Sequence, residues 1–222
     1  MSYPFGDRGR AKTLNMVYKV FKRAFDFMSA LLLFIVISPL FLVLMICVKF
    51  SIGSPIFFYQ ERSGRNEKPF KLIKFRTMTN ARDAEGNLLP DYKRLTKFGR
   101  FLRNSSLDEL PELLNIIRGD MAVIGPRPLY MKYNQYYTEY ERKRNMVRGG
   151  LIPPESLYYD SFLTWDKQLK YEADYADKLS FMLDVRILIS VFKTMLRRNK
   201  EDYGAYDRQA LDVERAGMVN KE

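Results

Sequence analysis

The sequence contains no histidine and a single cysteine among its 222 residues. The absence of histidine removes the most common general base and the most common nitrogen ligand for metals. Cys47 lies alone inside an apolar run, which excludes a disulfide framework, a cysteine-rich zinc site and a Cys–His dyad. Neither a P-loop nor a GxGxxG motif occurs. Any catalysis must therefore depend on Asp, Glu, Lys, Ser, Thr or Tyr, with or without a hard metal ion held by carboxylate oxygens.

The chain is strongly basic. There are 37 Lys and Arg residues against 26 Asp and Glu, which gives a formal net charge of +11. Such an excess does not define a fold, but it favours anionic partners: nucleic acid, an anionic membrane surface or phosphorylated substrates. The length suits one compact domain with additional segments, or two small domains.

One long apolar run interrupts this basic chain. The segment from Ala30 to Val48 carries no charge, and about 19–20 helical residues reach across roughly 30 Å of hydrocarbon. A cleaved signal peptide is disfavoured, because the basic region before the run is long and no small-residue cleavage site follows it. The alternative is a buried core helix, but so unbroken a run favours membrane insertion.

The centre and the flanks of the run differ in the topology that they favour. Pro39 removes a helix hydrogen bond, and Ser38 can satisfy the freed carbonyl. On local physics alone, a kinked spanning helix is the more common outcome. Basic flanks prefer the cytoplasm, however, and here both flanks are basic. A re-entrant helix that breaks at Ser38-Pro39 and leaves the membrane by the face that it entered would keep both basic flanks in the cytoplasm. The flanking basic residues are Arg8, Arg10, Lys12, Lys19, Lys22 and Arg23 before the run, and Lys49, Arg62, Arg65 and Lys68 after it.

The sequence predicts four segments and several local elements. The segments are a flexible arm (1–15), an amphipathic lead-in with the membrane helix (16–52), a catalytic domain (53–199) and a polar tail (200–222). The elements are irregular or short-strand structure within 54–78 with a turn at Ser63-Gly64, a surface loop at 80–91, a helix from near Ser106, an amphipathic helix at 130–145, and an amphipathic helix at 182–198. The helix at 130–145 carries a tyrosine stripe, which is more typical of packing than of a ligand site.

Two adjacent carboxylates, Asp108 and Glu109, lie at the predicted start of a helix. Ser106 and Glu109 have the spacing of a capping box, in which the hydroxyl and the carboxylate satisfy helix-start amides. Pro111 is compatible with a first helical turn. These local residues alone favour a capping role.

The neighbouring sequence favours a chemical role instead. Residues 61–103 contain twelve Lys or Arg against five Asp or Glu. A helix N-terminus attracts phosphate, and Gly125-Pro126 forms a turn that presents Arg127. Ionised Asp can accept a phosphoryl group, and positioned cations supply most of the catalysis of such transfers.

The chain closely resembles the bacterial sugar transferases, or monotopic phosphoglycosyl transferases, from about Tyr18 to Leu196. The resemblance is carried by "KRAFDFMSA", the Ser38-Pro39 break, "GSPIFFYQERSGRNEKPFKLIKFRTM" and "LRNSSLDELPELLNIIRGDMAVIGPRPL", and more weakly by "LTWDKQLKYEADYADKLSFMLDVRIL". It implies a mixed α/β, mostly helical fold: a re-entrant helix-break-helix plus a small cytosol-facing catalytic domain with amphipathic interfacial helices. It also implies transfer of a sugar phosphate from a nucleotide diphosphate sugar, here a UDP-sugar, to undecaprenyl phosphate.

The resemblance implies a role for each matching residue. Asp108 is the nucleophile that takes the sugar phosphate covalently, Glu109 is its partner, and both hold magnesium. Arg103 and Arg127 hold phosphates, and Lys74 faces the lipid phosphate or the diphosphate. The complete set of implied substrate-binding residues is Lys74, Arg76, Arg103, Arg127 and Arg148.

One segment departs from the family pattern. Members usually carry a Pro-Gly-Ile-Thr-Gly-like motif followed by Gln, whereas this chain reads "VRGGLIPPESLYYD" at 147–160. Arg148 and a glycine remain, but Thr and Gln are absent, so donor recognition is expected to differ.

The implied location is the cytoplasmic face of the bacterial inner membrane. The implied partners include anionic lipids and downstream glycosyltransferases of capsule, O-antigen or exopolysaccharide synthesis, with a homodimer left open. Two rivals also stay open at this stage: a non-catalytic lipid-docked adaptor, and a membrane-tethered nucleic-acid binder, for which no motif is present.

Overall fold

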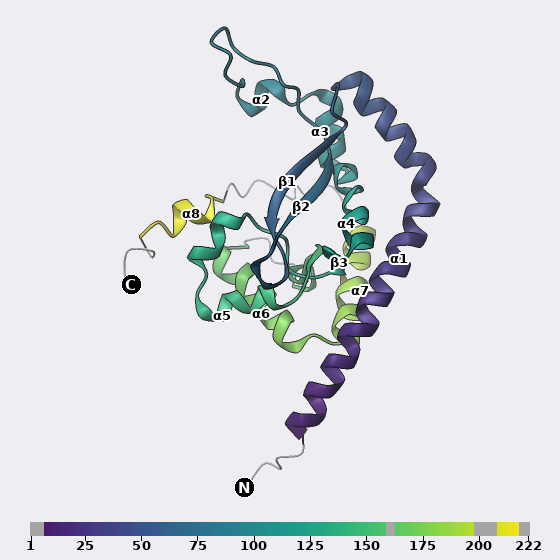
Figure 1. Ribbon diagram of the computed structural model, residues 1–222, viewed down its shortest axis with the longest axis vertical. Helices are drawn as coiled ribbons and strands as arrows, with labels where there is room; N and C mark the ends of the chain where they lie inside the picture. Colours follow the sequence, from purple (N-terminus) through teal and green to yellow (C-terminus); the bar gives the residue numbers. More distant parts are fainter. Residues whose placement is uncertain (1–6, 159–162, 198–207, 218–222) are drawn as a thin grey trace.

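The computed structural model describes residues 7–158, 163–197 and 208–217, with side chains described from Tyr18 onward to Thr194 in the first two segments. Within these residues the chain is mostly helical and contains two small sheets (Figure 1). The helices are α1 Asp7–Ser51, α2 Asp91–Arg94, α3 Lys97–Asn104, α4 Glu112–Arg118, α5 Glu139–Arg142, α6 Trp165–Lys178, α7 Phe181–Arg197 and α8 Leu211–Glu214. The strands are β1 Phe57–Ser63, β2 Pro69–Phe75, β3 Met121–Ile124 and β4 Gly149–Ile152. The 3-10 helices are η1 Arg65–Glu67, η2 Leu107–Glu109, η3 Met131–Tyr136, η4 Lys143–Met146 and η5 Pro154–Leu157.

Helix α1 is a single element of 45 residues that curves around the rest of the molecule (Figure 1). It begins at Asp7, inside the predicted arm, and its helical structure continues through Pro39, so the predicted break is not an interruption of the helix. The missing N–H of Pro39 would leave the carbonyl of Ile35 without a donor. Ser38 Oγ donates a hydrogen bond to that carbonyl at 2.8 Å. The predicted compensation by Ser38 is therefore confirmed, and it explains how the helix continues.

The two faces of α1 have different surroundings. The inner face packs against the domain through Ala30, Phe41, Leu44 and Val48, all of which are buried. The outer face remains apolar and exposed, and only 17% of the most apolar 18-residue window within Tyr18–Ser51 is buried. By length and composition this segment can cross a membrane, and its exposure differs from that of a soluble core helix, which is mostly buried. Membrane association is the role that this exposed face fits.

The hairpin of β1 and β2 confirms the short strands predicted after the apolar run. The strands are antiparallel, with Phe57 opposite Phe75 and Ser63 opposite Pro69. Phe75 is buried and packs against Phe41 of α1, with ring centroids 4.9 Å apart. The hairpin is thereby fixed against the membrane helix, and it carries Lys74 next to this packed ring.

Strands β3 and β4 are parallel and come close to each other at glycines. A Cβ at Gly150 would meet the backbone nitrogen of Gly125 at 2.0 Å, so a side chain has no room there. This close approach fixes the start of the loop 125–128, which follows β3 and carries Arg127.

The segment 130–145 differs from its prediction as one amphipathic helix. The structure forms three short pieces, η3, α5 and η4, with extended residues between η3 and α5. Tyr133 and Tyr137 are buried beside Trp165, which confirms the packing role predicted for the tyrosines, whereas Tyr140 is exposed. The short pieces arise because Thr138 begins a separate helix with a capping box to Glu141.

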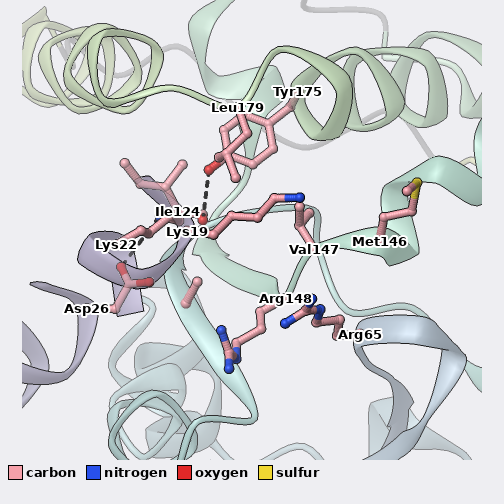
Figure 2. Close-up of a pocket in the computed structure, with 11 residues that line it drawn as sticks. Lys19, Lys22, Asp26, Arg65, Ile124, Met146, Val147, Arg148, Tyr175 and Leu179 are labelled. Atoms are coloured by element: carbon pink, nitrogen blue, oxygen red, sulfur yellow. Dashed lines mark hydrogen bonds and ion pairs between the residues drawn. The ribbon is translucent and has the colours of Figure 1, made fainter. Parts of the chain in front are cut away.

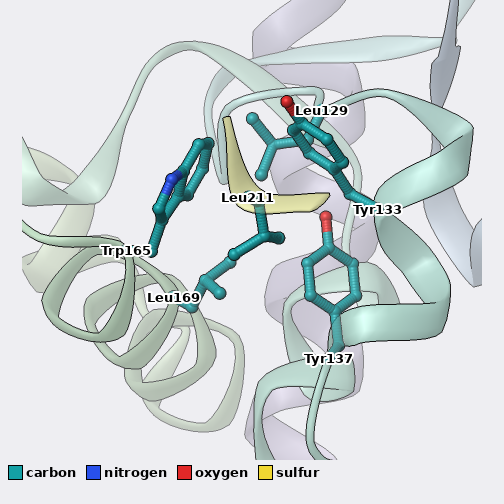
Figure 3. Close-up of a cluster of buried hydrophobic side chains, with 6 residues drawn as sticks. All are labelled: Leu129, Tyr133, Tyr137, Trp165, Leu169 and Leu211. Carbon is teal, nitrogen blue, oxygen red and sulfur yellow. The ribbon is translucent and has the colours of Figure 1, made fainter. Parts of the chain in front are cut away.

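The predicted polar tail also differs, for the part that is described. Residues 208–217 pack on the domain, and Leu211 is fully buried between Trp165, Leu169 and the tyrosines (Figure 3). Arg215 donates to both carboxylate oxygens of Glu141, at 2.7 and 2.8 Å. This part of the tail belongs to the core; residues 200–207 and 218–222 lie outside the described part. Before the tail, α7 confirms the helix predicted at 182–198.

Candidate active site

The acid pair, Asp108 and Glu109, lies in the short helix η2 between α3 and α4. The predicted capping box is wrong. Ser106 has a left-handed backbone (φ 55°), and its side chain makes no capping hydrogen bond. A non-glycine residue in this region is uncommon and turns the chain sharply after α3. The Glu109 carboxylate is therefore directed away from Ser106 and bonds to side chains from distant segments.

Glu109 joins three elements of the fold. Its Oε1 accepts a hydrogen bond from Lys74 Nζ of β2 at 2.6 Å and another from Arg127 Nη2 at 3.1 Å. Burial alone would raise the pKa of Glu109, but Arg127 and Lys74 outweigh it and hold the pKa below its usual value. Glu109 is accordingly ionised at neutral pH and keeps two cations at the site.

A third carboxylate, Glu112, also contacts Lys74. Glu112 Oε1 lies 3.2 Å from Lys74 Nζ, and the residue is buried in the first turn of α4. Burial raises the pKa of Glu112 to about 7, with Lys74 opposing the shift and Glu109 adding to it. Lys74 is thus shared between an ionised carboxylate and one that titrates near neutral pH. Sequence reasoning missed Glu112, which reads as an ordinary helix residue.

Asp108 is placed differently from Glu109. It is half-buried, and among the described residues no other side chain donates a hydrogen bond to its carboxylate. Burial raises its pKa, with the charge of Glu109 adding to the shift, whereas Lys74 and Arg103 lower it. An acid without a fixed partner beside several cations retains free oxygens for an incoming phosphorus or cation.

The other predicted substrate-binding arginines occupy three different settings. Arg103 is exposed, and its Nε donates to Thr77 Oγ1 at 3.0 Å; its charge acts on Asp108. Arg76 is buried, and it donates to the backbone carbonyls of Met78, at 2.9 Å, and Ser54. Arg76 therefore holds the chain on either side of the hairpin, and its contact with substrate stays a prediction.

Arg148 lies apart from the acid pair. Its Nε donates to the carbonyl of Gly119 at 2.8 Å, and its side chain lines a pocket that includes neither member of the pair. The donor-binding role predicted for Arg148 stays a prediction. The departing segment 147–160 is described up to Tyr158; it forms β4 and η5.

A buried ion pair positions Arg127. Arg144 Nε and Glu172 Oε2 are 2.6 Å apart, and both side chains are almost inaccessible to solvent. Glu172 Oε1 accepts the backbone N–H of Arg127 at 2.9 Å, while Arg144 donates to the Arg127 carbonyl. The backbone of Arg127 is therefore held from both sides. Sequence reasoning also missed this pair, because the two residues are 28 positions apart and no local pattern links them.

The acid pair fits the donor set that magnesium requires. Magnesium is usually bound through one or two carboxylates, several waters and the phosphates of a substrate. Asp108 and Glu109 supply two adjacent carboxylates, and Glu109 uses only Oε1 in its contacts with Lys74 and Arg127. Within the described residues there is no cluster of three or more acidic or cysteine side chains that would form an all-protein cage. Magnesium held with a phosphorylated substrate is the arrangement that these residues fit.

Comparisons with known proteins identify the family of the chain. The family profile described as "Bacterial sugar transferase" matches residues 17–198. A protein of Bacillus subtilis named as the uncharacterized sugar transferase EpsL is 44% identical over 177 residues, which cover 80% of this chain and 88% of that protein. The exopolysaccharide production protein ExoY of Sinorhizobium fredii is 36% identical, over 78% of this chain and 83% of that protein.

A longer relative has a name that specifies its reaction. The UDP-glucose:undecaprenyl-phosphate glucose-1-phosphate transferase of Klebsiella pneumoniae is 34% identical over 198 residues, which cover 84% of this chain but 42% of that protein. These matches, on a chain with a paired-acid site, define an enzyme of the phosphoglycosyl transferase class. The chain belongs to the bacterial sugar transferase family.

Proposed function

We propose that this enzyme transfers a sugar 1-phosphate from a UDP-sugar to undecaprenyl phosphate through a covalent intermediate on Asp108. The observation that carries the proposal is the Asp108 carboxylate, which accepts no hydrogen bond from another described side chain and lies next to Glu109, the residue that holds Lys74 and Arg127. The named relatives use undecaprenyl phosphate, which supports the choice of acceptor. The product would begin the synthesis of a cell-surface glycan.

The proposed reaction has two displacements at one phosphorus atom. An Asp108 oxygen attacks the sugar-linked phosphorus of the donor, and the bond to the nucleotide phosphate breaks, so that UMP leaves with its electron pair. A phosphate oxygen of undecaprenyl phosphate then attacks the same phosphorus. The bond to Asp108 breaks, and the carboxylate is regenerated as the lipid diphosphate sugar forms. No external oxidant, reductant or additional proton donor is required.

The cations of the site support both displacements. Lys74 and Arg127 both contact Glu109, and their positive charges are close enough to Asp108 to stabilise charge on phosphate oxygens there. The exposed Arg103 adds a third positive charge near Asp108. Magnesium held by Asp108 or Glu109 would neutralise diphosphate charge and stabilise the departing nucleotide.

Donor turnover separates this proposal from a non-catalytic adaptor. The full chain is incubated with magnesium, undecaprenyl phosphate and each member of a panel of UDP-sugars. We expect UMP release and a lipid diphosphate sugar with at least one donor. An adaptor needs no donor. A related transferase, assayed with the same panel under the same conditions, serves as the positive control. If that transferase turns over a donor and this chain turns over none, the proposal is contradicted.

We also propose that α1 enters and leaves the membrane at the cytoplasmic face. The basic residues at both ends of the apolar run support this topology. Helix α1 is continuous through Pro39, but it curves (Figure 1), and the missing N–H of Pro39 weakens the helix at the centre of the run. Single cysteines in place of Arg10 and Lys68, in a Cys47→Ser background, should both be labelled from the cytoplasmic side only. Pro39→Leu, which restores the missing N–H, should shift the labelling toward opposite sides. If the two cysteines are labelled from opposite sides in variants that retain Pro39, α1 spans the membrane instead.

A further inference from the structure

A cationic pocket lies between the N-terminal part of α1 and the domain (Figure 2). Its volume is about 50 Å³, and Lys19 of α1, Arg65 of η1 and Arg148 before β4 line it together. Val147 and the buried Tyr175 also contribute to its walls. None of Lys74, Asp108, Glu109 and Arg127 lines this cationic pocket.

The positive charges of the cationic pocket are not balanced within the described residues. Asp26 is the only carboxylate among its lining residues, and it already accepts the N–H of Val123 at 3.2 Å and lies 3.5 Å from Lys22. No described carboxylate lies within ion-pair distance of Lys19, Arg65 or Arg148. Burial lowers the pKa of Arg148, and the charges of Arg23 and Arg65 lower it further. Like charges held together in this way favour the binding of an anion, which offsets their repulsion.

A second hollow, the apolar groove, lies beside the cationic pocket. It is a groove of about 700 Å³ between α1 and α7, and most of its wall is apolar. Lys22, Asp26 and Ile124 line both hollows, so the two are adjacent. The remaining lining residues of the apolar groove include Phe21, Phe25, Val185 and Leu188. Phe21 and Phe25 are 69% and 60% exposed and belong to the outer face of α1, so the groove is continuous with the apolar surface of the membrane helix.

We infer that one anionic phospholipid occupies both hollows, with its phosphate in the cationic pocket and an acyl chain in the apolar groove. The charge of the pocket matches a phosphate, and the groove continues the membrane-facing surface of α1, where an acyl chain is the available apolar partner. A soluble phosphate would fill the first hollow and leave the second without an occupant. The lipid would fix the start of α1 to α7, where Lys22 and Asp184 already form an ion pair at 2.7 Å. This inference does not depend on the proposed reaction.

Lipid binding to the purified full chain tests the inference. Phosphatidylglycerol and phosphatidylcholine with identical acyl chains are titrated and counted by native mass spectrometry. The triple variant Lys19→Gln, Arg65→Gln, Arg148→Gln should bind phosphatidylglycerol about tenfold more weakly or worse, because each cation near a lipid phosphate contributes substantially, and it should lose its preference over phosphatidylcholine. The matched control replaces three exposed lysines elsewhere, Lys71, Lys93 and Lys170, and should change the affinity by less than about twofold.

The apolar groove is tested by a second change. Val185→Trp fills it and should weaken the binding of both lipids, whereas glycerol 1-phosphate, which has no acyl chain, should not compete with phosphatidylglycerol. The Asp108→Asn variant should bind lipid like the wild type, which separates this test from the proposed reaction. The inference is overturned if the triple variant keeps its lipid preference, if the control triple loses as much affinity, or if glycerol 1-phosphate competes fully.

Discussion

Asp108→Asn is expected to fold, associate with membranes and bind donor, yet to release UMP several orders of magnitude more slowly than the wild type. The substitution keeps the shape of the side chain but removes the nucleophile, and the chain has no histidine to replace it. Release of UMP from UDP-sugar, measured with and without undecaprenyl phosphate, gives the rate. With donor and magnesium but no lipid, the wild type should release about one equivalent of UMP and gain the mass of a sugar phosphate on the peptide that contains Asp108.

The matched control is Asp91→Asn, which changes an exposed acid in the first turn of α2. Loss of a helix-start acid costs about 1 kcal/mol or less, so this variant should remain active. Glu109→Gln is expected to be severely impaired as well, because it releases Lys74 and Arg127 from their shared carboxylate. Near-normal turnover by Asp108→Asn, with the substitution confirmed by mass, would show that Asp108 is not the nucleophile.

Glu172→Leu is expected to destabilise the fold strongly. It removes the ion-pair partner of the buried Arg144, and removing one partner of a buried pair costs about 3–5 kcal/mol. It also removes the acceptor for the backbone N–H of Arg127. Thermal or denaturant unfolding in detergent measures the loss, and steady-state kinetics with a donor that the wild type uses measures the effect on turnover.

The double variant Arg144→Met, Glu172→Leu separates stability from positioning. Replacement of both charges by apolar groups of similar volume often restores stability, so the double variant should recover most of the unfolding free energy. Its turnover should stay low, because the carbonyl and the N–H of Arg127 have both lost their partners. Glu172→Gln, which keeps an acceptor for the N–H of Arg127, should retain more turnover than Glu172→Leu. Full activity of the double variant would show that the buried pair serves only stability.

The sequence predicted those features that depend on neighbouring residues. The apolar run, the hairpin after it and the helix at 182–198 follow from local periodicity, and α1, β1–β2 and α7 confirm them. Ser38 and the carbonyl of Ile35 are only three residues apart, so their hydrogen bond was also predictable. The acid pair was located by its motif, although its residue roles rest on the proposed reaction.

The features that the sequence did not predict depend on distant partners. Ser106 and Glu109 have the spacing of a capping box, but Lys74, 35 positions away, and Arg127 bind the carboxylate instead. Arg215 in the predicted tail pairs with Glu141 across 74 positions, and this pairing makes a polar segment part of the core. A local sequence pattern indicates which contacts a residue could make, but the contacts that it does make depend on the tertiary fold.

The buried C-terminal residues have a consequence for biosynthesis. Ser51 ends the membrane helix, and Arg215, which completes the core, is synthesised 164 residues later. At about 5–20 residues per second, this interval lasts roughly 8–33 s. The inner face of α1, including Phe41 and Val48, therefore leaves the ribosome well before the domain that covers it is complete. We expect a helix that enters the membrane during this interval to have lipid on both faces, so that the folding domain would displace lipid from the inner face.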